Sequence, residues 1–169
     1  LHRNIAIGYQ TMANVGSNGP DDNIAMGYHA LNALTTAGSN TAIGSYAGRL
    51  ITTGHSNTAV GYEALFNVVT GLRNTAVGMA AGEIVLGSDN TMIGNYAGFY
   101  ATGSNNTFVG SYAGRGGTTS APYSSGENNV AVGYEALKAF TTANRMVAIG
   151  LEAMTDVTNG EDSVAIGYQ

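Results

Sequence analysis

A nine-residue phrase that recurs along the whole chain constrains the fold more than any other feature of the sequence. Residues 57–65 read NTAVGYEAL, and edited copies of this phrase occur ten times in the 169 residues. The glycine of each copy lies at Gly8, Gly27, Gly44, Gly61, Gly78, Gly94, Gly110, Gly133, Gly150 and Gly167. Successive glycines are 16 to 23 residues apart, and the commonest spacing is 17. A period of this kind is typical of repeat proteins, in which each unit stacks on its neighbours.

The residues before each glycine alternate as they do in a short β-strand. Thr75 and Val77 share one face of the expected strand, and Ala76 points to the other. The position just before the glycine is bulky and apolar in all ten copies, so we interpret it as a stacked core column. The position before that is Ala in eight copies, with Met92 and Phe108 as the exceptions, which indicates close approach of another backbone, across the coil or from a partner chain.

Asparagine lies four positions before the glycine in eight of the ten copies, and Met146 and Ser163 replace it in the last two. Asparagine tolerates a left-handed backbone and hydrogen-bonds its own turn. Stacked asparagines can also form a hydrogen-bonded ladder. We therefore expect a structural ladder rather than a ligand site in this column.

The residues after the glycine are of two kinds, as in YEAL at 62–65 and SYAG at 45–48. We interpret them as two ways to fill the same space under a turn. The rest of each repeat, such as 66–71, is predicted to be a second short strand followed by a glycine turn. We therefore predict an all-β chain, a parallel β-roll (β-solenoid) of about ten 17-residue coils that forms one domain over residues 1–169. Longer loops are expected at 14–22 and 115–128, and loops of this kind often lie on a binding face.

Composition excludes several classes of protein. Charged residues are only 10% of the chain, the net charge is −5, and no basic run occurs, so we expect no nucleic-acid partner. The chain has no cysteine, hence no disulfide or thiolate metal site. No apolar run reaches about 18 residues, so we expect no membrane insertion by this segment. Low charge with abundant Gly, Asn, Ser and Thr favours a rigid, extracellular, surface-displayed protein. Both ends of the sequence cut through a repeat, so we expect a segment of a longer fibre.

The phrases SVAIG (163–167), NVAVG (129–133) and NTAIG (40–44) resemble the head repeats of trimeric autotransporter adhesins of the YadA type over essentially the whole chain. The resemblance implies a left-handed roll, three chains packed around a common axis, and attachment to host surfaces. The repeat of those adhesins is shorter. The YEAL and SYAG endings are similar instead to repeats of phage-type tail fibres and bacterial surface fibres that end in a self-cleaving chaperone domain. Either relation implies an elongated trimeric fibre, and neither supplies a catalytic residue.

Each coil has only a few bulky apolar side chains, so a lone narrow roll would be marginally stable. Burial of apolar side chains against identical chains would stabilise it. We therefore expect a homotrimer, with the number three taken from the resemblance.

Candidate ligand-binding residues are the tyrosines of the small-first turns and of the longer loop. Tyr46, Tyr96 and Tyr112 share one repeat position, and Pro122 and Tyr123 lie in the loop at 115–128. An exposed aromatic edge beside Asn and Ser suits stacking against a sugar, so we expect a cell-surface glycan or a protein receptor as the partner. The alternative is that these rings only pack over the neighbouring glycine ends of the turns.

No enzymatic motif is present, and we expect neither catalysis nor a cofactor or metal. Glu63, Glu135 and Glu152 occupy one repeat position and so predict an exposed row rather than a converging acid pair, although a pair across a subunit boundary stays open. Acidic pairs at 21–22 and 161–162 could hold calcium, but no Asp-rich nonapeptide repeat occurs. The alternatives to an adhesin are a structural spacer within a fibre and a polysaccharide-processing tailspike.

Overall fold

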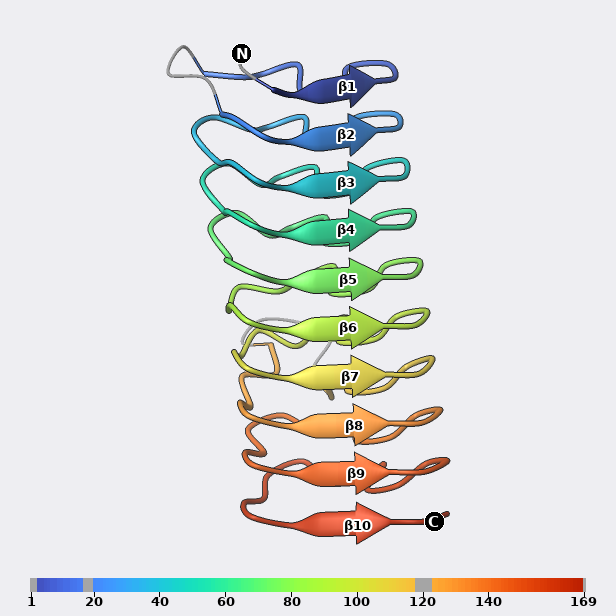
Figure 1. Ribbon diagram of the computed structural model, residues 1–169. Helices are drawn as coiled ribbons and strands as arrows, with labels where there is room; N and C mark the ends of the chain where they lie inside the picture. The colour runs from blue at the N-terminus through green and yellow to red at the C-terminus, as the bar shows by residue number, and fades with distance from the viewer. Residues whose placement is uncertain (1–2, 17–19, 118–122, 169) are drawn as a thin grey trace.

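The chain winds into a single column of stacked coils, each of which contributes one short strand. The computed structural model describes residues 3–16, 20–117 and 123–168. Its ten strands form one parallel sheet in the order of the sequence, with β1 and β10 at opposite ends of the stack (Figure 1). The strands are β1 (Ile5–Ile7), β2 (Ile24–Met26), β3 (Thr41–Ile43), β4 (Thr58–Val60), β5 (Thr75–Val77), β6 (Thr91–Ile93), β7 (Thr107–Val109), β8 (Val130–Val132), β9 (Val147–Ile149) and β10 (Val164–Ile166). The fold is thus an all-β parallel solenoid of about nine turns, as the period predicts, and the described residues include no helix.

Equivalent residues of neighbouring coils lie directly above one another. Thr58 pairs with Thr75 in the sheet, and Val60 pairs with Val77. The longest repeat does not shift this register, because Thr107 still pairs with Val130. The extra residues lie in the loop between β7 and β8, so every repeat position forms a column along the whole stack. The predicted loops at 14–22 and 115–128 are described in part, since residues 17–19 and 118–122 lie outside the described residues.

The prediction of a second strand in each coil is wrong. In the described residues, the return side of the coils contributes only isolated bridges, at Ala101 with Ser124 and Asn144 with Glu161. Elsewhere this side is a series of turns and bends that still bonds to the next coil. For example, the Val69 carbonyl accepts hydrogen bonds from the N–H groups of both Thr52 and Thr53, at 3.1 and 3.3 Å. Because two donors share one acceptor, the regular strand ladder is interrupted there.

The prediction that the bulky column before the glycine forms the core is also wrong. The alternation is as expected, but the two faces are exchanged: Ile93 is 42% exposed, whereas its neighbour Met92 is fully buried. The buried column consists of Ala25, Ala42, Ala59, Ala76, Met92, Phe108, Ala131 and Ala148. A second buried alanine, such as Ala64, comes from the turn of every coil from the second to the ninth. The interior of the roll is so narrow that alanine is the usual residue on the strand side, and the larger Leu65 and Val68 fill the rest.

The glycine after each strand is required by the spacing of the coils. Gly61 has a φ of +136°, and a Cβ built on it would lie 2.4 Å from the carbonyl oxygen of Gly78 in the next coil. Only glycine fits such a close approach of two backbones with this φ. The same contact continues from coil to coil, which explains why this residue never varies.

The two kinds of turn share one backbone shape. The second and fourth residues after the glycine have positive φ in both, as in Glu63 (56°) and Leu65 (50°) or Tyr46 (61°) and Gly48 (57°). Leu65 of the first kind is fully buried and fills the core under its turn. Glycine at this place in the second kind leaves that volume to other side chains, which agrees with the interpretation of two ways to fill one space.

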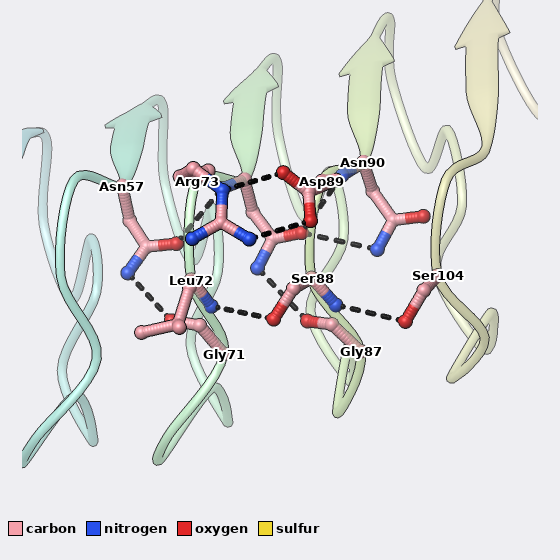
Figure 2. A network of polar contacts seen from close by, with 10 residues as sticks. Asn57, Gly71, Leu72, Arg73, Gly87, Ser88, Asp89, Asn90 and Ser104 are labelled. Carbon is pink, nitrogen blue, oxygen red and sulfur yellow. Dashed lines mark hydrogen bonds and ion pairs between the residues drawn. The ribbon is translucent and has the colours of Figure 1, made fainter.

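The expected asparagine ladder is confirmed and lies inside the roll (Figure 2). Asn57 donates from Nδ2 to the carbonyl oxygen of Gly71 at 2.8 Å, and its Oδ1 accepts the backbone N–H of Asn74 at 3.0 Å. Asn74 repeats this arrangement with Gly87 and Asn90, at 3.0 and 3.1 Å. The ladder therefore bonds the two sides of one coil and also each coil to the next.

Candidate binding surface

The turns that follow the strands form one long edge of the stack (Figure 1). Most aromatic residues of the chain stand on these turns, and many of their rings contact one another. They form two groups that ring contacts within the described residues do not join. The first aromatic cluster consists of Tyr9, Tyr28, His29, Tyr46, Tyr62 and Phe66. The second aromatic cluster consists of Tyr96, Phe99, Tyr100, Tyr112, Tyr123 and Tyr134.

The second aromatic cluster brings together three of the predicted site residues. The rings of Tyr96 and Tyr112 stack 5.4 Å apart and 6° from parallel. Tyr123 of the long loop stacks on Tyr100 at 5.7 Å, and Phe99 lies between Tyr100 and Tyr96, at 4.4 and 5.2 Å. The loop and the tyrosine column thus form one continuous surface. Pro122, the remaining predicted residue of this loop, lies outside the described residues.

Tyr46 belongs to the first aromatic cluster and is packed on several sides. The His29 ring stacks on it at 5.7 Å, and the rings of Tyr28 and Tyr62 meet it edge-on at 5.2 and 6.1 Å. The two coils between those of Tyr46 and Tyr96 carry Glu63 and Ala80 at this position, so the tyrosine column is broken there. The predicted single column of three tyrosines is therefore divided between two clusters.

The exposed rings stand directly after the glycines, a position that we expected to fill space under the turn, and Tyr168 (75%) and Tyr9 (64%) are the most exposed of them. Tyr28, Tyr62 and Tyr134, the first residues after their glycines, are 44 to 48% exposed, whereas Tyr46, Tyr96 and Tyr112 are half-buried. In turns such as YEAL the tyrosine is the first residue after the glycine, and in turns such as SYAG it is the second. This position in the sequence determines how far the ring is exposed. Strand alternation continued past the glycine places the first residue outward, and this would have identified the exposed rings.

Acidic residues on the same edge do not form the fully exposed row that was predicted. Glu63, Glu135 and Glu152 are half-buried. Glu135 lies 2.8 Å from the Nζ of Lys138, whose hydrogen bond lowers the pKa of that carboxyl. Burial, with a smaller contribution from the charge of Glu63, raises the pKa of Glu83 to about 6.

The candidate calcium ligands are engaged with cations. Asp22 lies 2.9 Å from Arg3, and Arg145 contacts both Asp162 and Glu161, at 2.6 and 2.9 Å. Within residues 3–16, 20–117 and 123–168, no group of three or more His, Asp or Glu side chains is placed to hold a metal ion. A depression of about 360 Å³ lies against β10, lined by Ala153, Met154, Ala165, Ile166, Gly167 and Tyr168, and none of the predicted site residues contributes to it.

The outer face of the sheet is a second, much larger candidate surface. We define the sheet face as the outward side chains at the first and third positions of the strands. The first positions are Ile5, Ile24, Thr41, Thr58, Thr75, Thr91, Thr107, Val130, Val147 and Val164. The third positions are Ile7, Met26, Ile43, Val60, Val77, Ile93, Val109, Val132, Ile149 and Ile166. None of these side chains is charged, and most third-position residues rank among the exposed large hydrophobics of the chain.

Comparisons with known proteins add no assignment to either surface. No protein-family model matches the chain, and no curated protein or solved structure matches it either. Among the residues that the structure describes, no helix could span a membrane.

Proposed function

We propose that this chain is a left-handed β-roll domain of an extracellular homotrimeric fibre, and that it attaches the fibre to a glycan or protein receptor on a cell surface. The observation that carries the proposal is the sheet face. Soluble monomers rarely leave a long apolar surface open to water, and such surfaces mark interaction sites. Here the surface runs over all ten strands and contains no charged side chain.

Identical chains are the partners that best suit the sheet face. Its two columns repeat with the same in-register spacing from β1 to β10. The sheet face of a second or third copy has the same spacing between strands over the same length. Side chains of one face can therefore pack between those of another along the whole contact. Three flat faces can close around one axis and leave none exposed, which is the closed symmetry that most homo-oligomers adopt.

The turn edge lies next to the sheet face, so in a trimer of this kind the two aromatic clusters face outward. Aromatic rings beside Asn and Ser side chains suit stacking against sugar rings. We assign attachment to Tyr46, Tyr96, Tyr112, Pro122 and Tyr123, with the second aromatic cluster as its main part. The exposed ring of Tyr134 extends that cluster.

A spacer without a ligand of its own is the second candidate. The continuous asparagine ladder supports it, because a rod whose coils are bonded to one another throughout would hold another domain away from a surface.

Binding of the folded protein to a glycan array and to whole cells tests the proposal. We expect binding that falls when Tyr96 or Tyr123 is changed to Ala, while Tyr168→Ala, outside both clusters, serves as the matched control. A folded trimer that binds neither the array nor any cell surface would favour the spacer.

A further inference from the structure

The cations of this chain separate into paired and unpaired groups. Arg3, Arg73, Arg145 and Lys138 each lie within 2.9 Å of a carboxylate oxygen. Arg49 and Arg115 form no ion pair with any described residue, and both lie over aromatic rings. Arg115 lies over one ring of the second aromatic cluster, with Cζ 5.5 Å from the centre of Tyr100. Arg49 lies over two rings, with Cζ 5.5 Å from the centre of Tyr46 and 5.4 Å from that of Phe66.

Two polar nitrogens, one within the first aromatic cluster and one on the arginine that lies against it, have no hydrogen-bond partner among the described residues. They are Nε of Arg49 and Nδ1 of His29, and both are shielded from solvent. The two side chains contact the same ring, since His29 stacks on Tyr46 at 5.7 Å and Arg49 lies over it. An unsatisfied polar atom in such a place is costly and calls for a group that completes it.

A guanidinium fixed on aromatic rings is well suited to an anion. Its planar fork binds a carboxylate or sulfate through two parallel hydrogen bonds, and stacking on the rings holds it in place beforehand. A ligand of Arg49 would displace no ion pair or hydrogen bond with the described residues. The exposed rings of Tyr28 and Tyr62, next to Tyr46, offer apolar surface for the ring of a sugar.

We propose that the first aromatic cluster together with Arg49 binds an acidic sugar unit of a surface polysaccharide. Arg49 takes the carboxylate or sulfate group, and Tyr28 or Tyr62 takes the apolar face of the sugar ring. This inference rests on the proposed attachment function and names its ligand class. It adds to the contacts proposed for Tyr96 and Tyr123 a second site, in a cluster of which only Tyr46 was predicted.

A neighbouring carboxylate should weaken the binding of an acidic sugar at this site. Glu63 directly follows Tyr62 in the chain and raises the pKa of the Tyr62 hydroxyl, so its carboxylate lies beside the proposed site and repels an anion. Replacement of this carboxylate with an amide, Glu63→Gln, should therefore tighten the binding of an acidic sugar and leave that of a neutral sugar unchanged.

Calorimetric titration of the folded protein with three oligosaccharides tests the proposal. The probes are a hyaluronan octasaccharide (carboxylate only), a chondroitin sulfate octasaccharide (carboxylate and sulfate) and maltoheptaose (neutral). We expect at least one acidic probe to bind and maltoheptaose not to bind. Arg49→Gln should weaken the acidic probe about 10- to 100-fold, as for the loss of charge-assisted hydrogen bonds, with Arg49→Lys in between. Arg73→Gln, an exposed arginine of the opposite turns, is the matched control and should change binding less than about twofold.

Equal binding of maltoheptaose, unchanged binding by a folded Arg49→Gln protein, or no binding of any probe would overturn the inference. The first two results leave the attachment function standing, since the protein still binds a sugar. Only the additional failure of the unmodified protein to bind the glycan array and cells would overturn the attachment function as well. Circular dichroism of each variant establishes that it is folded.

Discussion

Phe108 occupies the space that a side chain at residue 114 would need. A Cβ built on Gly114 would lie 2.3 Å from Cδ1 of Phe108, and the Phe108 ring is fully buried. The pair shows how the roll keeps a constant width. Where the strand contributes a large residue in place of Ala, the turn contributes Gly in place of Leu.

Gly114→Ala should destabilise the protein by about 2–4 kcal/mol, because the new methyl overpacks the core and adds the strain of a φ of +53°. The double variant Phe108→Ala, Gly114→Leu reproduces the arrangement of other coils, in which Leu65 adopts a similar φ. Phe108→Ala and Gly114→Leu each lower the free energy of unfolding when made alone. We expect the loss for the double variant, measured by urea denaturation, to be smaller than the sum of these two losses by about 1–3 kcal/mol. Additive losses would show that the two positions do not share one space.

Removal of one rung of the asparagine ladder should be costly. Asn57→Ala deprives the Gly71 carbonyl and the Asn74 N–H of their bonds inside the roll. We expect a loss of about 2–5 kcal/mol in the free energy of unfolding, measured by urea denaturation. Asn95→Ala, at an exposed position, is the control and should stay within about 0.5 kcal/mol. A loss at Asn57 no larger than at Asn95 would mean that the ladder does not stabilise the fold.

Glu83 makes stability depend on pH. Its pKa of about 6 in the folded protein exceeds the ordinary value of 4.5, so the folded state favours the protonated carboxyl. The stability that this gives is complete below about pH 4.5 and lost as the pH rises through about 6. We therefore expect Glu83→Gln to stabilise the protein at pH 7.5, by at most about 1 kcal/mol because the carboxyl is only partly buried.

The difference between Glu83→Gln and the unmodified protein should fade toward pH 4.5. Thermal denaturation across this range measures it, and Glu63→Gln should lower the pKa of Glu83 by removing a like charge. Glu127→Gln, at an exposed site, controls for the loss of a carboxylate. A constant difference between the Glu83 variant and the unmodified protein at all pH values would contradict the assignment.

The sequence predicts the period, the parallel stack and the ladder, because each is a property of residues that recur at one repeat position. It does not reveal which face of a three-residue strand lies inside. Val77 is larger and more apolar than its neighbour Ala76, so size alone places it in the core. The inside of the roll is too narrow for a bulky residue on most strands, because the turn alanines such as Ala64 pack close to the strand. The period of the sequence does not reveal this distance.

The candidate site was predictable in part for a related reason. Tyr96 and Tyr112 recur one coil apart, and their stacking follows from the period. Arg49 and Phe99 stand at the fifth position after the glycine, where other coils carry Phe66, Arg115 and Lys138, so this position is aromatic or cationic in five coils but has no single residue type. Tyr100, one position further on, has no aromatic equivalent in the other coils. Their roles depend on contacts between different repeat positions, as in the approach of Arg49 to Tyr46.

Substitutions on the two faces of β5 should have opposite effects. Ala76→Lys places a charge in the fully buried column and should abolish the β-sheet signal in circular dichroism. Val77→Lys, one residue away on the sheet face, should leave the coil fold intact and separate the chains instead. A variant with lysine at residue 77 that remains assembled would exclude β5 from the contact between copies.

The solution mass of the unmodified protein, measured by light scattering after size exclusion, tests the central claim most directly. One chain has a mass of 17.2 kDa, so three chains give 3 × 17.2 = 51.6 kDa. The exposed apolar sheet face predicts the larger value at micromolar concentration. A stable, folded species of 17.2 kDa would show that this face needs no identical neighbour, and would contradict the account.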